Sequence, residues 1–487
     1  MMTLPIYVPP LIALGGGLLI ALFRFRGRAA RSLFTLLVTA LTAAGALLVI
    51  LGPDVPCLPL LTVTEGFSLC LRLDDLGRVF AGLISFLWPL AALYAFEYMK
   101  HEERENTFFA FYTVTYGITL GIALSGNMFT LYVFYEALSL ITLPLVSHKQ
   151  DEKSMKAGMT YMKYTIGGAT LGLVGLICLS GFGDLSVFTP GGAMNAEAVN
   201  ANPDLFRALF LVAVIGFSVK AAIFPLCRWL PEASVAPTPV TALLHAVAVV
   251  NAGAFALIRL IYHCVGTEMI FGTWAQSAAL LLTAFTVFYG AVRAVRERHM
   301  KRRLAWSTVS NLNYILFSAC LMTREGATGA LAHMVFHGLI KITLFYCAGA
   351  WLVQTGKQYL RDLRGVYKSM PVITVIFAVA GICLTGIPPF AGFLSKWEIL
   401  TAALSCANPF AIAGVVAIIL SSVMCAVYLL SPAVQMIFMP ASEALRLQPG
   451  KDPGPCMKVP MILLTAVIVF ACVFAMPLIE FFRGAVI

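Results

Sequence analysis

The stretch Lys220-Ala-Ala-Ile-Phe-Pro-Leu-Cys-Arg-Trp-Leu-Pro231 places a lysine and a proline inside an apolar run that extends from Leu205 to Leu230. A lysine at the centre of a bilayer costs at least ~2.5–3.5 kcal/mol, and a proline leaves a backbone carbonyl that lipid does not satisfy. The pair indicates a broken transmembrane helix that lines a polar cavity, the usual place for an ion site in a transporter. A second stretch, Gly386-Ile-Pro-Pro-Phe-Ala-Gly-Phe-Leu-Ser-Lys396, again combines proline and lysine within one apolar run.

The composition is typical of a membrane protein. Of the 487 residues, 60% are hydrophobic and only 11% are charged, which is too little charge for the surface of a soluble domain of this size. The first apolar run, 6–23, has no basic region before it and no small-residue cleavage site, so we expect a retained span and not a signal peptide. The twelve cysteines form no CxxC pair, so neither a zinc site nor an iron–sulfur cluster is indicated.

Apolar runs of about 20 residues recur along the chain and predict an all-α polytopic membrane protein with fourteen transmembrane helices. The expected spans are 5–23, 30–51, 76–96, 107–125, 127–147, 158–180, 205–230, 236–264, 274–293, 304–322, 327–353, 372–404, 410–439 and 461–482. Between them, residues 53–75 alternate enough to form a short external hairpin. Residues 181–204 are rich in Gly, Asn and Pro and predict an external loop.

The basic residues predict the orientation. With the N-terminus outside, 23 of the 33 Lys and Arg residues fall in cytoplasmic segments, five in external segments and five within spans. This asymmetry is a positive-inside signal, and it places both termini on the external side of the inner (cytoplasmic) membrane. It also accounts for the net charge of +10 without any nucleic acid partner.

The intramembrane bases predict an internal repeat. Lys163 and Lys220 lie 57 residues apart in the sixth and seventh spans, and Lys341 and Lys396 lie 55 apart in the eleventh and twelfth. An offset of five spans is odd, so the second unit would be inverted relative to the first. We therefore expect two inverted five-helix repeats with broken helices 7 and 12. The expected units are 1–105 (helices 1–3 and the hairpin), 106–265 (first repeat), 266–439 (second repeat) and 440–487 (cytoplasmic link and helix 14).

Glu136 is the acid expected deep in a helix of the first repeat. A carboxylate and the Lys220 ammonium would stabilise each other's charged forms when close, and separation would favour release of the lysine's proton. Their Coulomb energy is ~4 kcal/mol at 4 Å with an effective dielectric of 20. The pair could therefore switch protonation with small movements. The alternative is a static buried salt bridge between two helices, which is rarely a net stabiliser.

His333, His337 and Lys341 fall at i, i+4 and i+8, which places them on one face of a helix. Imidazoles titrate near neutral pH and can relay protons. Two histidines at this spacing can also bind zinc, but no HExxH motif and no third ligand accompany them. His245 is isolated in the eighth span, where a proton relay and a hydrogen-bonded structural histidine both remain open.

Two further charged residues lie near these positions. Arg259 is close to the external end of the eighth span, where its side chain could simply extend to the interface. Glu398 follows Lys396 by two residues, so the two side chains point to different faces of the helix, and Glu398 receives no role.

Eight short segments between about residues 70 and 430 together form a specific pattern. They are Tyr135-Glu136-Ala-Leu-Ser, Lys163-Tyr164, Lys220-Ala-Ala-Ile-Phe-Pro, Leu230-Pro-Glu-Ala, Ala236-Pro-Thr-Pro-Val-Thr-Ala-Leu-Leu-His245, Arg303-Leu-Ala-Trp-Ser-Thr-Val-Ser, His337-Gly-Leu-Ile-Lys341 and Gly386-Ile-Pro-Pro-Phe-Ala-Gly-Phe through Lys396. The pattern resembles the antiporter-like subunits of respiratory complex I, membrane-bound energy-converting hydrogenases and Mrp-type cation/proton antiporters. The resemblance implies a fourteen-helix fold with inverted repeats, broken helices 7 and 12, and charged residues along the membrane midplane.

The resemblance also implies roles for single residues. By it, Glu136 and Lys220 form the family's ion pair, Lys163 is their partner in the sixth span, His245 and Lys341 are central relays, and Lys396 is the terminal site of the second half-channel. The chain departs from the family in three ways. Asn251 stands where some members have lysine, Lys396 is a glutamate in some members, and a long lateral helix after the fourteenth span is missing. The last departure disfavours the distal antiporter-like subunit of complex I.

The leading hypothesis is an ion-pumping subunit of a redox-driven membrane complex, of the energy-converting hydrogenase or complex I type. We expect no cofactor and no catalytic chemistry in this chain, with other membrane subunits and peripheral redox subunits as partners. A proton, or a sodium ion, would pass along Lys220, His245 and Lys341 toward Lys396 and the external face.

Two other hypotheses remain. The first is a subunit of an Mrp-type antiporter that exchanges sodium for protons without a redox partner. The second is a carrier for an organic solute, but a carrier needs one pocket, whereas this chain has a row of titratable residues.

Overall fold

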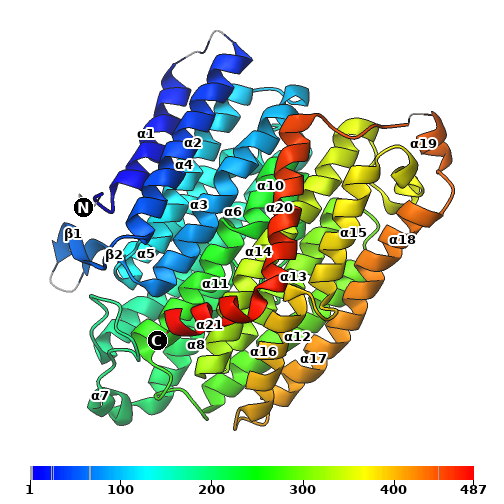
Figure 1. Ribbon diagram of the computed structural model, residues 1–487. Helices are drawn as coiled ribbons and strands as arrows, with labels where there is room; N and C mark the ends of the chain where they lie inside the picture. The colour runs from blue at the N-terminus through cyan, green and yellow to red at the C-terminus, as the bar shows by residue number, and fades with distance from the viewer. Residues whose placement is uncertain (1–3, 24, 26, 65–66, 448, 487) are drawn as a thin grey trace.

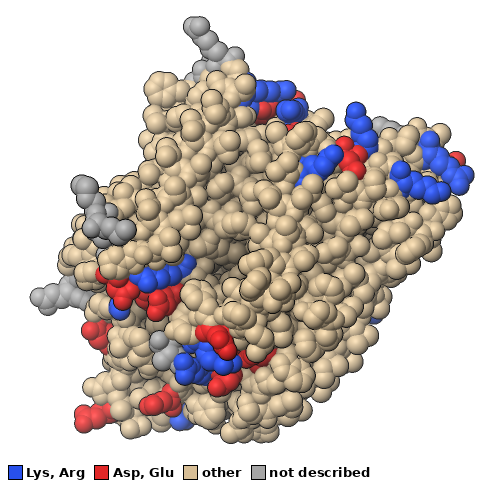
Figure 2. Space-filling view, in the orientation of Figure 1, with Lys and Arg blue, Asp and Glu red and all other residues tan. Residues whose placement is uncertain are grey.

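The computed structural model describes residues 4–23, 25, 27–64, 67–447 and 449–486. Figure 1 shows long helices that lie side by side with similar tilts. Within the described residues, nine helical segments are long and apolar enough to cross a membrane, and two shorter apolar helices accompany them. Figure 2 shows charged residues at the two ends of the helices and a broad band without charge between them on this face. The chain is therefore a multi-pass helical membrane protein.

The N-terminal half contains a hairpin and eleven helices. The predicted hairpin within 53–75 is confirmed, since β1 and β2 pair in antiparallel fashion. The predicted loop 181–204 contains one short helix, α7. The elements are α1 (Val8–Leu22), α2 (Arg28–Ile50), β1 (Val55–Thr64), β2 (Phe67–Leu73), α3 (Asp75–Tyr98), α4 (Glu105–Ala123), α5 (Met128–Val146), α6 (Glu152–Leu179), α7 (Ala196–Ala201), α8 (Pro203–Ser218), α9 (Trp229–Glu232), α10 (Thr238–Ala246) and α11 (Val249–Arg259).

The C-terminal half is arranged around α14, which packs against α10, α13, α15 and α16 and is almost entirely buried. Helices α17 and α18 form the edge of the molecule at the right of Figure 1. The elements are α12 (Trp274–Arg296), α13 (Met300–Cys320), α14 (Arg324–Thr355), α15 (Pro371–Thr385), α16 (Ala391–Ser405), α17 (Ala411–Cys425), α18 (Ser431–Phe438), α19 (Glu443–Leu447), α20 (Pro455–Val473) and α21 (Ala475–Ala485).

The two predicted helix breaks are present. Helix α8 ends at Ser218, and residues 219–228 run as turns before α9 begins. Helix α15 ends at Thr385, and α16 begins after the segment 386–390. Each break contains proline, which lacks the N–H that a continuous helix needs. Lys220 lies within the first break, and Lys396 lies in α16 just after the second.

The predicted span over 236–264 is present, since Thr238–Val265 is one of the nine segments long and apolar enough to cross a membrane, but a third break interrupts its helix. Helix α10 ends at Ala246 and α11 begins at Val249. The amide nitrogen of Asn251 donates to the Ala246 carbonyl at 2.7 Å, and the N–H groups of Val247 and Ala248 both donate to the Leu243 carbonyl. The Asn251 side chain therefore satisfies a carbonyl that the interruption leaves free, so the break carries no cost of an unpaired acceptor.

The last predicted span, 461–482, is also wrong as a single helix. Helix α20 ends at Val473, and α21 runs across the other helices in Figure 1. Pro477 explains the end of α20, because it has no N–H to donate to the Val473 carbonyl. Helix α21 then packs Phe482 against Phe336 of α14, with ring centroids 6.1 Å apart.

Candidate functional site

Lys220 lies in the break after α8 and is fully buried. Its Nζ donates to the carbonyl of Tyr135 on α5 and stands 3.4 Å from the centroid of the Tyr135 ring. Glu136, the next residue on α5, is the one carboxylate that acts electrostatically on Lys220, but no ion pair within 4.0 Å joins the two in the described part of the chain. The Oε1 atom of Glu136 is buried without a hydrogen-bond partner there. The two predicted partners are therefore neighbours held apart, with the lysine bound to backbone.

Asn251 links the region of Lys220 to His245. A Cβ on Gly253 would lie 3.0 Å from Lys220 Cβ and 2.7 Å from the Ala221 nitrogen, so α11 approaches the break as closely as a glycine allows. Asn251 lies two residues before this contact, and its amide binds the carbonyl next to His245. Both ring nitrogens of His245 are buried and lack partners among the described side chains and backbone. Such groups require water or a mobile proton donor in the working protein.

Helix α14 carries His333, His337 and Lys341 on its buried face, as predicted. Lys341 Nζ donates to the Leu304 carbonyl at 3.2 Å and to the Ser307 hydroxyl of α13. Lys341 also acts electrostatically on His245 and on both histidines of α14. The rings of His333 and His337 lie 6.0 Å apart. Buried titratable residues therefore continue from Lys220 and His245 along α14 to His333, His337 and Lys341, and we call this series the row.

Lys396 ends the row at the second predicted break. Its Nζ donates to the carbonyls of Leu384 and Thr385 at 3.0 and 2.9 Å, and to the Ser422 hydroxyl at 3.2 Å. The two carbonyls belong to the last turn of α15, where a cation is favoured by the helix dipole. The hydroxyl of Ser395, one residue before Lys396, lies 3.0 Å from His333 Nδ1. Lys396 thus connects to α14 through its own helix.

Lys163 is the predicted site residue that does not join this row. Its side chain is exposed on the outer face of α6. Tyr161, two residues earlier, points inward, where its hydroxyl lies 2.7 Å from that of Thr142 on α5. Residues two apart on a helix point to different faces. Lys163 therefore faces the surroundings of this chain and not the Glu136–Lys220 region.

Neutral polar residues between the charged ones were missed by the sequence interpretation. Helix α13 supplies most of them, and Tyr314 of the same helix places its ring 5.4 Å from Lys396 Nζ. The signal was present, because five of seven consecutive residues within an expected span carry hydroxyl or amide groups. These five are Ser307, Thr308, Ser310, Asn311 and Asn313.

A second cluster of charges lies near the hairpin. Arg259 donates twice to the Asp74 carboxylate, at 2.5 Å for each bond, and its guanidinium stacks between the rings of Phe188 and Phe255. The expectation that Arg259 merely extends to the interface is therefore wrong. Burial opposes ionisation of Asp74, but the charge and hydrogen bonds of Arg259 outweigh it and hold the pKa of Asp74 below its usual range.

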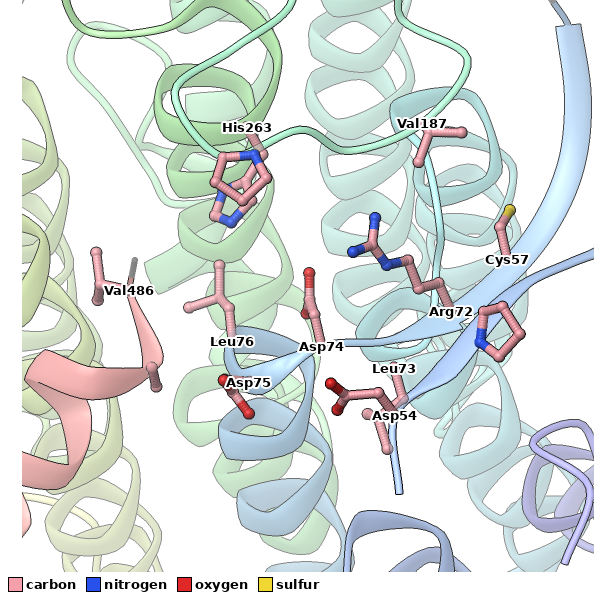
Figure 3. A pocket seen from close by; sticks show the side chains of 13 residues that line it. Asp54, Cys57, Arg72, Leu73, Asp74, Asp75, Leu76, Val187, His263 and Val486 are labelled. Carbon is pink, nitrogen blue, oxygen red and sulfur yellow. The ribbon is translucent and has the colours of Figure 1, made fainter. Parts of the chain in front are cut away.

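Asp74 of this cluster lines a cavity of about 620 Å³, together with Asp54, Arg72 and Asp75 (Figure 3). His263, one turn after Arg259, lines it and is 5% exposed, with Nδ1 unpartnered among the described residues. Val486, beyond α21, lies on the opposite side of the cavity from Arg72 in Figure 3. Phe255, whose ring contacts the Arg259 guanidinium, also stacks on Phe80, with ring centroids 4.7 Å apart.

Replacing Asp74 with asparagine is expected to lower the unfolding free energy by roughly 3 kcal/mol, because the buried Arg259 charge loses its partner. The folded-state pKa of Asp74 lies below that of an unfolded chain, about 3.9. The pair therefore stabilises the fold fully above that pH, and this contribution is lost as the pH falls below it. Thermal unfolding of both proteins at several pH values measures this. The Asp75→Asn variant is the control, since the Asp75 side chain, 3.4 Å from Arg78, is 60% exposed, so that the pair is worth less than about 1 kcal/mol. Equal effects of the two variants would contradict the prediction.

Comparisons with known proteins agree with the resemblance seen in the sequence. Residues 125–422 match the family model described as NADH:quinone oxidoreductase/Mrp antiporter, transmembrane. A probable A/B-type subunit of a K(+)/H(+) antiporter from Rhizobium meliloti (strain 1021) is 35% identical over 337 residues, which are 68% of this chain and 32% of that protein. The A-type subunit of the Na(+)/H(+) antiporter from Alkalihalophilus pseudofirmus is 35% identical over 364 residues, 70% of this chain and 43% of that protein. The chain thus spans less than half the length of these curated relatives.

Two solved structures share the fold over nearly the whole chain. One is a chain of the membrane-bound sulfane sulfur reductase, an archaeal respiratory membrane complex, with a TM-score of 0.83, 22% identity, and coverage of 99% of this chain and 96% of that one. The other belongs to the Mrp complex from Dietzia sp. DQ12-45-1b, with a TM-score of 0.82, 20% identity, and coverage of 98% and 97%. The fold, the buried row of basic residues and the family match agree. The chain belongs to the NADH:quinone oxidoreductase/Mrp antiporter transmembrane family.

Proposed function

We propose that this chain is an ion-translocating subunit of a multisubunit membrane complex, and that it moves protons along the row from Glu136 through Lys220, His245, Lys341 and the two histidines of α14 to Lys396. The single observation that carries the proposal is the burial of this row. Three lysines at most 4% exposed bind carbonyls or hydroxyls and have no carboxylate within ion-pair distance in the described chain. Buried ionisable groups of this kind mark ion paths in membrane proteins.

We further propose the finer architecture that the sequence predicted, with fourteen spans, both termini on the external side of the inner membrane, and inverted repeats over 106–265 and 266–439. The parallel between the two breaks supports the repeats. Each break follows an apolar helix and places a lysine against backbone carbonyls, at Tyr135 in one and at Thr385 in the other. The uncharged band in Figure 2 supports the orientation of the helices across a bilayer.

The curated relatives favour cation/proton exchange of the Mrp type over a redox-driven pump. One is named as an A/B subunit of a K(+)/H(+) antiporter and the other as an A subunit of a Na(+)/H(+) antiporter, and each is 35% identical to this chain. In this function, neighbouring membrane subunits would exchange sodium or potassium against the proton that this chain carries. The likeness to a chain of a respiratory reductase keeps a redox-driven complex as the second candidate, in which peripheral subunits would supply the energy.

Transport by the native complex, purified and reconstituted in proteoliposomes, distinguishes the two candidates. An imposed pH gradient should collapse upon addition of Na⁺ or K⁺, without an electron donor, and the vesicle interior should accumulate the cation. Proton movement that requires an electron donor would support the redox-driven complex instead. A complex that moves no protons under either condition would contradict the proposed function.

A further inference from the structure

A polar cavity of about 460 Å³ opens near the start of α13, between the loops before α6, before α10 and after α14. Its walls hold several charged side chains. Many of them are basic, as expected for the cytoplasmic side of the molecule. Two of its lining groups are deeply buried. Lys301 is 6% exposed and Ser234 is 3% exposed, and the Ser234 hydroxyl has no partner among the described residues. A buried, unpartnered hydroxyl at the wall of a polar cavity is a position for ordered water.

Lys301 binds the backbone of another residue that lines this cavity, Ala236. Its Nζ donates to the Ala236 carbonyl at 2.6 Å, and no carboxylate forms an ion pair with it within the described chain. The hydroxyl of Thr241 donates to the same carbonyl at 3.1 Å. The ammonium and the hydroxyl therefore share one acceptor and lie within the reach of a single bridging water.

Helix α10 continues this connection toward the row. Thr238, Thr241 and His245 fall at i, i+3 and i+7, so they form one polar stripe along the helix, about 10 Å long at 1.5 Å per residue. All three are fully buried. At the outer end, the Thr238 hydroxyl lies 3.2 Å from the hydroxyl of Tyr98, which lines the cavity. At the inner end, His245 has two free ring nitrogens among the described groups.

Electrostatics connects the two ends as well. Lys301 and Lys341 are the two cations that act on His245. The charged groups that face Lys301 from neighbouring segments are Glu102, Lys149 and Lys153. A proton on Lys301 therefore acts electrostatically on His245.

We infer that Lys301, with Thr241 and Thr238, forms a proton-uptake path from the cavity to His245, separate from the Glu136–Lys220 pair. This inference rests on the proposed function. A hydronium ion in the cavity gives its proton to the neutral amine of Lys301 and leaves water. The ammonium passes that proton through bridging water and the Thr241 hydroxyl to a His245 nitrogen, and Lys301 returns to its neutral form. The row is thus supplied at its centre as well as at its first end.

The test is proton transport by the native complex carrying substitutions at Lys301, measured in proteoliposomes. Lys301→Gln and Lys301→Arg should both slow transport at least tenfold, because glutamine carries no proton and arginine does not release one. Lys301→His should retain transport with a changed pH dependence, since imidazole titrates near neutral pH. Thr241→Val should also reduce transport, whereas Thr241→Ser, which keeps the hydroxyl, should not. Arg361→Gln is the matched control, because this side chain is 81% exposed and distant from the row.

Two results would overturn the inference. Full transport by Lys301→Gln would show that the lysine is dispensable, and full transport by Lys301→Arg would show that only a fixed charge at the Ala236 carbonyl is needed. Lys220→Met, measured in parallel, separates this failure from failure of the proposed function. If Lys220→Met stops transport while Lys301→Gln does not, only the uptake path is wrong. If neither stops it, the proposed function is wrong. If the Lys301→Gln complex fails to assemble, the Thr241 variants provide the test. Slow transport by Thr241→Val with normal transport by Thr241→Ser supports the uptake path, and normal transport by both variants overturns it.

Discussion

Replacing Lys220 with methionine is expected to reduce proton transport by at least about 100-fold, equivalent to ~2.7 kcal/mol of lost transition-state stabilisation. Lys220 is fully buried in the break after α8, where its Nζ binds the Tyr135 carbonyl, and methionine of similar length carries no proton. The fold should survive, since exchanging a buried charge for an apolar side chain of similar volume is often neutral or stabilising. Transport in proteoliposomes and the thermal unfolding of the purified complex measure the two effects.

Lys368→Met is the matched control for this prediction. It removes one positive charge from an exposed position in the segment between α14 and α15. The control should transport at the normal rate. A Lys220→Met complex that assembles and transports normally would show that the proton path does not pass through the break after α8.

Replacing Lys341 with methionine is expected to stop steady-state transport to a similar extent. Lys341 binds Leu304 and Ser307 of α13 and influences the histidines on both sides of it, so no other described base can take its central place. The Glu136–Lys220 pair should remain able to bind a proton once. A rapid pH step should therefore still produce one brief uptake phase in Lys341→Met, without continued turnover.

The control here is Ser307→Ala, which removes one acceptor of Lys341 and keeps the lysine. Loss of a single hydrogen bond of this kind costs about 1–3 kcal/mol, so transport should slow without stopping. Continued turnover in Lys341→Met would contradict the central role of this residue and would favour a path that joins His245 to His333 by water alone.

Much of the fold was predictable because membrane insertion leaves a simple record in sequence. The apolar runs and the breaks at Lys220 and Lys396 follow from the cost of charge and of unpaired backbone in lipid, and the external hairpin follows from its alternating pattern. The break after Ala246 was not predictable from proline or glycine. It depends on the amide of Asn251, which replaces a backbone donor from five residues away in sequence. A side-chain substitution for a backbone bond depends on three-dimensional contact and has no periodic signature.

The candidate site was likewise predictable only in part. Its charged residues could be identified in the sequence because a charged side chain within a transmembrane segment costs free energy. The sequence did not show which of these side chains face inward. Lys163 and Lys220 both lie within apolar runs, but Lys163 is exposed and Lys220 is buried. The position of Arg259 also required the structure, because its partner Asp74 lies 185 residues earlier in the chain. The neutral polar residues of α13 were visible, but hydroxyls in a membrane helix commonly bond to their own backbone.

The attachment of Lys396 to the last carbonyls of α15 has a mechanical consequence. If this lysine gives up its proton or swings away, the carbonyl oxygens of Leu384 and Thr385 lose the ammonium that donates to both of them. The segment from Gly386 to Phe390 must then rewind or admit a water molecule to compensate. The protonation of Lys396 and the conformation of the segment between α15 and α16 therefore change together. A proton that passes through Lys396 would change how these two helices are joined.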